Sequence, residues 1–212
     1  VTQLHPAIEP RFHWLVSRMP SEFHFQNERL DKVYSHLAQK LFIAIVGVLL
    51  LAALTTADRL LAGGLIALAL WLLRYDIARR NISTTGLTRF IAACLLSGYF
   101  WLLAAGLLGL AGALTPGHAW RDAALHAIGL GFVFAMVFGH ATIIFPAVTR
   151  IRIPYHPVLY LPLVLLHLTL ALRVFGGLAG NFDLRHNAAL LNGLVLLVFI
   201  ATVVTLVRRG KR

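Results

Sequence analysis

Long apolar runs are the feature that most restricts what this chain can fold into. A helix rises about 1.5 Å per residue, so about 20 apolar residues cross the hydrocarbon core of a bilayer. The runs therefore predict an all-α integral membrane bundle of about six transmembrane helices. The second run is the shortest and follows a tight turn, so the first two runs are expected to form a tilted hairpin. The six runs lie at 38–57, 59–75, 88–114, 122–148, 156–178 and 187–207.

The charged residues favour a membrane protein over the other classes that a basic chain suggests. Of the 212 residues, 59% are hydrophobic and 13% are charged, whereas a soluble domain is about half apolar and about a quarter charged. The formal charge of +11 would suit nucleic-acid binding. The Lys and Arg residues, however, lie between the apolar runs and not on one amphipathic face. We therefore expect a lipid bilayer and no nucleic acid as partner. Cys94 is the single cysteine, which excludes an internal disulfide and a Cys-based metal motif.

The basic residues also predict an orientation. With six spans, fifteen of the 19 Lys and Arg residues fall on one side of the membrane, and the other four are Arg59, Arg121, Arg173 and Arg185. Cytoplasmic loops are the ones that carry an excess of Lys and Arg. Both termini are therefore expected in the cytoplasm, and the localisation that fits best is the inner (cytoplasmic) membrane of a bacterium.

The charge pattern divides the chain into three parts. Residues 1–37 are expected to form a cytoplasmic N-terminal tail, 38–207 the transmembrane domain, and 208–212 a basic cytoplasmic C-terminus. Within the tail, 11–19 mixes aromatic residues with Arg, as interfacial helices do, although a solvated tail fits equally well. Residues 27–40 are expected to form a helix that runs into the first span. Small residues in the second and third spans predict contacts with another membrane subunit or another copy of the chain. These residues are Gly63, Gly64, Gly98, Gly106, Gly109 and Gly112.

Four histidines within or beside the last three spans carry most of the functional information. A titratable ring inside a membrane is costly and faces a partner, a cofactor or a water path. His126 and His140 are 14 residues apart, and His156 and His167 are 11 apart. In regular α-helices, each pair would share one face of its span. Imidazole suits haem iron, copper and zinc, so His140 is expected to ligate a cofactor opposite His156 or His167.

Two alternatives remain beside cofactor binding. Membrane histidines also hydrogen-bond neighbouring helices without binding anything. A proton or ion path is the weaker alternative, because such relays normally combine His with intramembrane Asp or Glu, which are nearly absent here. Arg173, near the outer end of the fifth span, is expected to pair with carboxylates, including those of haem propionates.

Two stretches of the chain resemble a known family. Residues 76–106 read DIARRNISTTGLTRFIAACLLSGYFWLLAAG, and 122–173 contain LHAIGLGFVFAMVFGHATIIFPAV and IPYHPVLYLPLVLLHLTLALR. They resemble the NnrS-like group of bacterial multi-helix membrane proteins, which is associated with haem, copper and nitric-oxide stress. Members of that group are about twice as long as this chain. The resemblance implies that His126, His140, His156 and His167 are candidate cofactor ligands.

These observations favour a membrane protein that binds haem b, with copper as an alternative metal. Its expected role is electron transfer or small-molecule redox handling, and whether it is an enzyme stays open. Cofactor-binding candidates are His126, His140, His156, His167 and Arg173, and metal-ligand candidates are His140, His156 and His167. The alternative function is a cofactor-free accessory subunit of a larger membrane complex.

Overall fold

The computed structural model describes residues 21–150 and 153–210, and every regular element in these two ranges is a helix. The predicted all-α class is therefore confirmed for the described residues. In chain order the elements are α2 (Ser21–Thr55), α3 (Asp58–Tyr75), α4 (Ala78–Asn81), α5 (Gly86–Leu110), α6 (Arg121–His126), the π-helix η1 (Ala127–Phe134), α7 (Ala135–Thr149), the 3₁₀ turn η2 (Pro157–Leu159), α8 (Tyr160–Leu178) and α9 (Phe182–Gly210).

Among the described residues, five helical stretches are long and apolar enough to cross a membrane, which identifies the chain as a membrane protein. They are His36–Thr55, Gly86–Leu110, Arg121–Val148, Pro157–Leu178 and Phe182–Arg209. The remaining expected span, at 59–75, corresponds to α3, which has only 18 residues. Three of them, Asp58, Arg59 and Arg74, are charged and lie at its ends.

The chain divides into two compact units, Val1–Ile43 and Ala44–Arg212. The expected helix at 27–40 is confirmed, because α2 is continuous through it and into the first apolar run. The interfacial segment expected at 11–19 lies outside the described residues.

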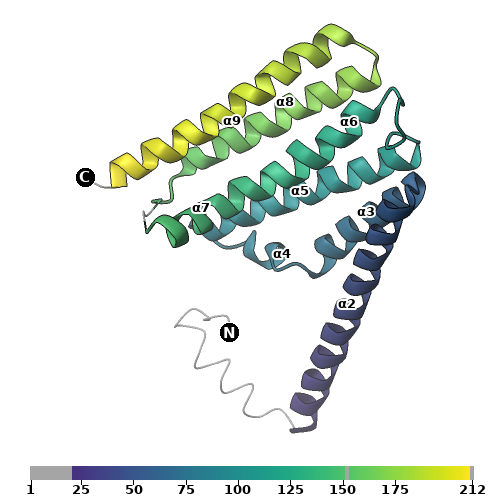
Figure 1. The fold of residues 1–212 in the computed structure, drawn as a ribbon. Helices are drawn as coiled ribbons and strands as arrows, with labels where there is room; N and C mark the ends of the chain where they lie inside the picture. Colours follow the sequence, from purple (N-terminus) through teal and green to yellow (C-terminus); the bar gives the residue numbers. More distant parts are fainter. Residues whose placement is uncertain (1–20, 151–152, 211–212) are drawn as a thin grey trace. The chain divides into compact units, whose positions relative to one another are not determined.

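Within the unit Ala44–Arg212, antiparallel helices pack as neighbours along the chain. α3 packs on α5, α5 on η1 and α7, α8 on α6 and η1, and α9 on α8 (Figure 1). Stacked rings also join α7 to α9, because Phe138 of α7 lies flat against Phe199 of α9 with ring centroids 3.8 Å apart. Large apolar side chains point outward, including Leu54 (83% exposed) and Leu190 (63% exposed). Such a surface is unfavourable in water and suits contact with lipid.

The glycines of α5 were expected to contact another subunit, and for Gly98, Gly106 and Gly109 this expectation is wrong. A Cβ at Gly106 would lie 2.6 Å from Ile66 Cγ1, and one at Gly109 would lie 2.8 Å from the Ala62 Cβ, both in α3. Gly98 faces η1 in the same way, with the Phe132 carbonyl oxygen 3.3 Å from a Cβ built there. In lipid, close backbone approach supplies much of the packing between helices. These small residues therefore hold the chain's own helices together.

Candidate functional site

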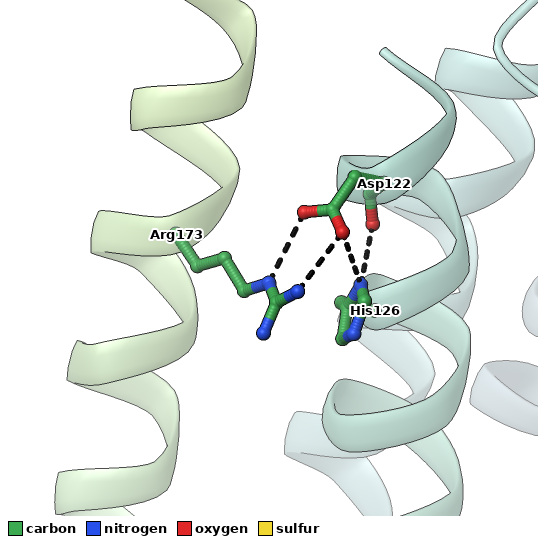
Figure 2. Close-up of polar contacts among 3 residues, drawn as sticks. All are labelled: Asp122, His126 and Arg173. Atoms are coloured by element: carbon green, nitrogen blue, oxygen red, sulfur yellow. Dashed lines mark hydrogen bonds and ion pairs between the residues drawn. The ribbon is translucent and has the colours of Figure 1, made fainter. Parts of the chain in front are cut away.

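A charged cluster joins α6 to α8 at the end of the bundle where α5 finishes. The Asp122 carboxylate accepts two hydrogen bonds from Arg173, from Nε at 3.1 Å and from Nη2 at 2.9 Å. Figure 2 shows Arg173 reaching from α8 across to Asp122 on α6, with His126 one turn further along. Parallel bonds of this kind are the strongest geometry for an Arg–carboxylate pair. Arg173 was expected to find a carboxylate, and the one it finds belongs to the protein.

His126 belongs to the same cluster through one ring nitrogen. Its Nδ1 lies 2.7 Å from the Asp122 carbonyl oxygen and 3.3 Å from the Asp122 Oδ1. A carbonyl can only accept, so Nδ1 carries the proton and donates, and Nε2 of the neutral ring keeps its lone pair. The His126 side chain is 32% exposed. A histidine held through Nδ1 by a carboxylate and a carbonyl, with Nε2 left open, has the arrangement found behind metal-ligating histidines.

A second polar network lies in the middle of the bundle, around His167 of α8. The Trp101 Nε1–H donates to His167 Nδ1 at 2.9 Å, and His167 Nε2 lies 2.9 Å from the Ser97 hydroxyl. Tryptophan has only a donor, so Nδ1 must accept and the proton of the neutral ring lies on Nε2. The His167 Nε2–H therefore donates to Ser97, whose hydroxyl donates in turn to the Ala93 carbonyl at 2.7 Å. Both ring nitrogens of His167 are occupied, so in this arrangement the ring ties α5 to α8 and has no lone pair left for a metal.

His140 of α7 resembles His126 in its hydrogen bonding but faces elsewhere. Its Nδ1 lies 2.9 Å from the Met136 carbonyl oxygen, which leaves Nε2 open. Met136 packs on the cluster formed by Ala78, Ala92, Leu95 and Tyr99, on the side of α4 and α5.

The expectation that His126 and His140 share one face is wrong because η1 separates them. This segment of eight residues is a π-helix, and each π turn takes up about one residue more than an α turn. The residues after it are therefore rotated relative to a continuous α-helix. As a result, His126 lies with Asp122 on the side of α8, whereas His140 follows Met136 toward α4 and α5.

The expected shared face of His156 and His167 also fails. His156 precedes the helix in an extended conformation, with φ −144° and ψ 140°. Its Nδ1 accepts a hydrogen bond from the Val158 N–H at 3.1 Å, so the ring caps the short turn η2. The neutral ring then carries its proton on Nε2, and His156 has no free lone pair in this arrangement.

The candidate ligands therefore do not gather into one centre. In the described part of the chain, no group of three or more His, Cys, Asp or Glu side chains could hold a metal ion. His126 and His140 each keep an open Nε2, whereas His156 and His167 do not. The groups available for chemistry are thus isolated imidazoles, one of them supported by a carboxylate. Sequence reasoning missed Asp122, Trp101 and Ser97, although the spacing of four between Asp122 and His126 was a readable signal.

One comparison with known proteins gives a match. The family described as "Domain of unknown function (DUF8744)" matches residues 20–208 of the chain. No curated protein and no solved structure matches it.

Proposed function

This chain belongs to the DUF8744 family, and from its residues we propose that it is an integral membrane protein that binds haem through His126. The observation that carries the proposal is the Asp122–His126 pair, with Nδ1 held at 2.7 Å by the Asp122 carbonyl and Nε2 open. Gly129, one turn further along, has no atom within 4 Å of a Cβ built on it, so the surface beside the ring is open. Bound haem would supply one-electron redox chemistry, which fits electron transfer or small-molecule redox handling. Copper is the alternative metal.

The residues fit one imidazole ligand and do not fit the expected bis-histidine site. His140 and His167 cannot face one another across a cofactor while His167 holds Trp101 and Ser97. His140 is the second candidate ligand because its Nε2 is open. Arg185 lies close to Asp122 and is the cation available for propionates, because Arg173 is already paired with the Asp122 carboxylate. Membership of the NnrS-like group stays a prediction. The resemblance supports the haem proposal only because it places candidate ligands at the same histidines.

An absorption spectrum of the purified full chain tests the proposal, together with a haem and metal assay. A single imidazole ligand predicts a high-spin spectrum and about one haem per chain. His126→Ala should remove the haem without loss of expression. His118→Ala is the matched control, because His118 lies in the loop before α6 and its Nδ1 accepts from the Trp120 N–H. Haem retained by His126→Ala but lost by His140→Ala would move the ligand to α7.

A cofactor-free accessory subunit of a membrane complex is the second candidate. The observation that favours it is the Trp101–His167–Ser97 network, in which an intramembrane histidine is used entirely for hydrogen bonds between α5 and α8. Purified wild-type protein with neither haem nor stoichiometric metal would exclude the haem proposal and favour this one.

The proposed topology has six spans, with both termini in the cytoplasm of a bacterial inner membrane. It is supported by the fifteen basic residues on one side and by the position of α3. This helix runs antiparallel along α5, with Ala62 beside Gly109 and Ile66 beside Gly106. A helix packed lengthwise on a span passes through much of the same depth of the bilayer.

A further inference from the structure

The end of α3 is recessed relative to the helix it packs on. Leu72 and Leu73, near the end of α3, pack on the cluster that contains Leu95 and Tyr99, and Asp76, which caps α3, lies close to the Tyr99 hydroxyl. Tyr99 is thirteen residues into α5, which begins at Gly86. At about 1.5 Å per residue, α3 therefore ends roughly 15–20 Å short of the level at which α5 begins. The chain covers the remaining depth through α4 and its flanking turns.

Aromatic and basic side chains gather at this recessed end, here called the α3–α4 corner and formed by Trp71, Arg74, Tyr75, Arg79 and Arg80. The rings of Trp71 and Tyr75 lie one turn apart, with centroids separated by 5.6 Å. The Arg74 guanidinium lies over the Tyr75 ring at 5.2 Å from its centroid. Arg79 Nη1 lies 3.4 Å from the Arg74 carbonyl oxygen, which brings a second guanidinium to the end of α3. Arg74, Arg79 and Arg80 are all exposed.

In the described part of the chain, no carboxylate forms a salt bridge with the guanidinium groups of the corner. Asp76, the acid between Arg74 and Arg79 in the sequence, is turned to the backbone and lies near Tyr99: its Oδ1 accepts from the Ala78 N–H at 2.7 Å. In the ranges that the structure describes, no ion pair involves Arg74, Arg79 or Arg80. Three guanidinium groups thus lie beside an apolar helix surface without an ion-pair partner in the described ranges.

We propose that the α3–α4 corner binds the headgroup of an anionic phospholipid, with Arg74, Arg79 and Arg80 as donors to its phosphate. Guanidinium groups match phosphate oxygens in geometry and charge, and Trp and Tyr favour the level of the headgroups. A zwitterionic lipid would bring an ammonium group that finds no acidic partner here. The corner therefore selects lipids of net negative charge, such as phosphatidylglycerol, over phosphatidylcholine.

Lipid binding to the purified full chain, delipidated in mild detergent, tests the proposal. Lipids with brominated acyl chains quench tryptophan fluorescence, and subtraction of the Trp71→Phe signal isolates the tryptophan of the corner. We expect phosphatidylglycerol to bind at least about fivefold more tightly than phosphatidylcholine, since one basic residue near an anionic surface contributes about that factor. The triple variant Arg74→Gln, Arg79→Gln, Arg80→Gln should reduce this preference to less than about twofold.

The matched control removes the same charge elsewhere, through Arg89→Gln, Arg208→Gln and Arg209→Gln, and should keep the preference. If the corner variant does not fold, Arg79→Gln alone should lower the preference by about fivefold at most. Equal binding of the two lipids by the wild type would overturn the proposal, as would an equal loss of preference in the control variant. Loss of the preference on addition of inorganic phosphate at constant ionic strength would also overturn it, because the site would then recognise a free anion.

Discussion

Because a tryptophan N–H can only donate, Trp101 determines the state of the histidine it contacts. Its hydrogen bond to His167 Nδ1 at 2.9 Å requires a neutral imidazole with the proton on Nε2. The His167 Nε2–H then donates a hydrogen bond to the Ser97 hydroxyl. The rings of Trp101 and His167 are also nearly parallel, with an interplanar angle of 21°. A polar side chain in a bilayer is costly without partners, and here one ring links two helices and leaves no donor or acceptor without a partner.

A double-mutant cycle on Trp101 and His167 should reveal coupling between them. Trp101→Phe removes the donor and His167→Phe removes the acceptor, so each variant should unfold more readily and the two effects should not add. Hydrogen bonds between membrane helices show coupling of about 0.6 kcal/mol on average and up to about 1.7 kcal/mol. Reversible unfolding in mixed detergent measures it.

The control cycle pairs Trp101→Phe with His140→Phe, because His140 bonds to its own helix at Met136. Additive effects are expected there. Additive effects in the Trp101–His167 cycle as well would mean that the bond contributes nothing to stability.

At the level of single residues, the sequence indicated which histidines lie within or beside the apolar helices but not what they touch. His167 was identified from its place inside an apolar run, which is a local property. Its partners are 66 and 70 residues away in the chain, and no spacing rule links residues so distant. The Asp122–His126 contact, by contrast, spans four residues of one helix and was open to prediction from the sequence.

Among the elements, η1 has the largest effect on the candidate site. Regular α-helical geometry would have placed His126 and His140 on one face, and the π-helix between them turns His140 toward α4 and α5. The sequence of η1 is uniformly apolar, so nothing in its hydrophobic pattern marks a change of helical period. The packing of η1 against α5 gives a reason for the π-helix. The Trp101 side chain lies directly against Gly131, and Gly98 faces the carbonyl oxygens of Gly131 and Phe132.

Gly131→Ala should therefore disturb both the packing of η1 and the Trp101–His167 bond. A Cβ at Gly131 would lie 2.4 Å from the Trp101 Cβ and Cγ, so the indole must move. Overpacking of this kind costs about 1–3 kcal/mol. Unfolding in mixed detergent measures the cost, and a red shift of the Trp101 fluorescence would report exposure of the ring.

Gly129→Ala lies in the same π-helix and provides the control. A Cβ there meets no atom within 4 Å, so its stability should stay within about 0.5 kcal/mol of the wild type. If the two alanine variants are equally stable, the close contact between Gly131 and Trp101 does not constrain the helix.

For the molecule as a whole, the fold class was the most predictable feature, because each apolar run is long enough to need a helix in lipid. All six runs coincide with helices, and five of them are long and apolar enough to span a membrane. The register of α3 on α5 was not predictable, because it depends on contacts between residues far apart in the sequence, such as Ala62 with Gly109 and Ile66 with Gly106. That register decides whether the chain crosses the membrane six times or five.

Cysteine labelling on a Cys94→Ala background should distinguish the two topologies. With six spans, Thr55→Cys and Ala119→Cys should react with a membrane-impermeant reagent from outside, and Ser83→Cys should react only after the cells are opened. All three positions are exposed in the structure.

If α3 does not cross, Thr55→Cys and Ser83→Cys lie on the same side of the membrane. Matching accessibility at these two positions would exclude six spans, because it would mean that α3 does not cross the membrane. Opposite accessibility is the expected result, since α3 packs along α5 from Gly109 to the level of Tyr99 and carries Arg59 and Arg74 at its two ends.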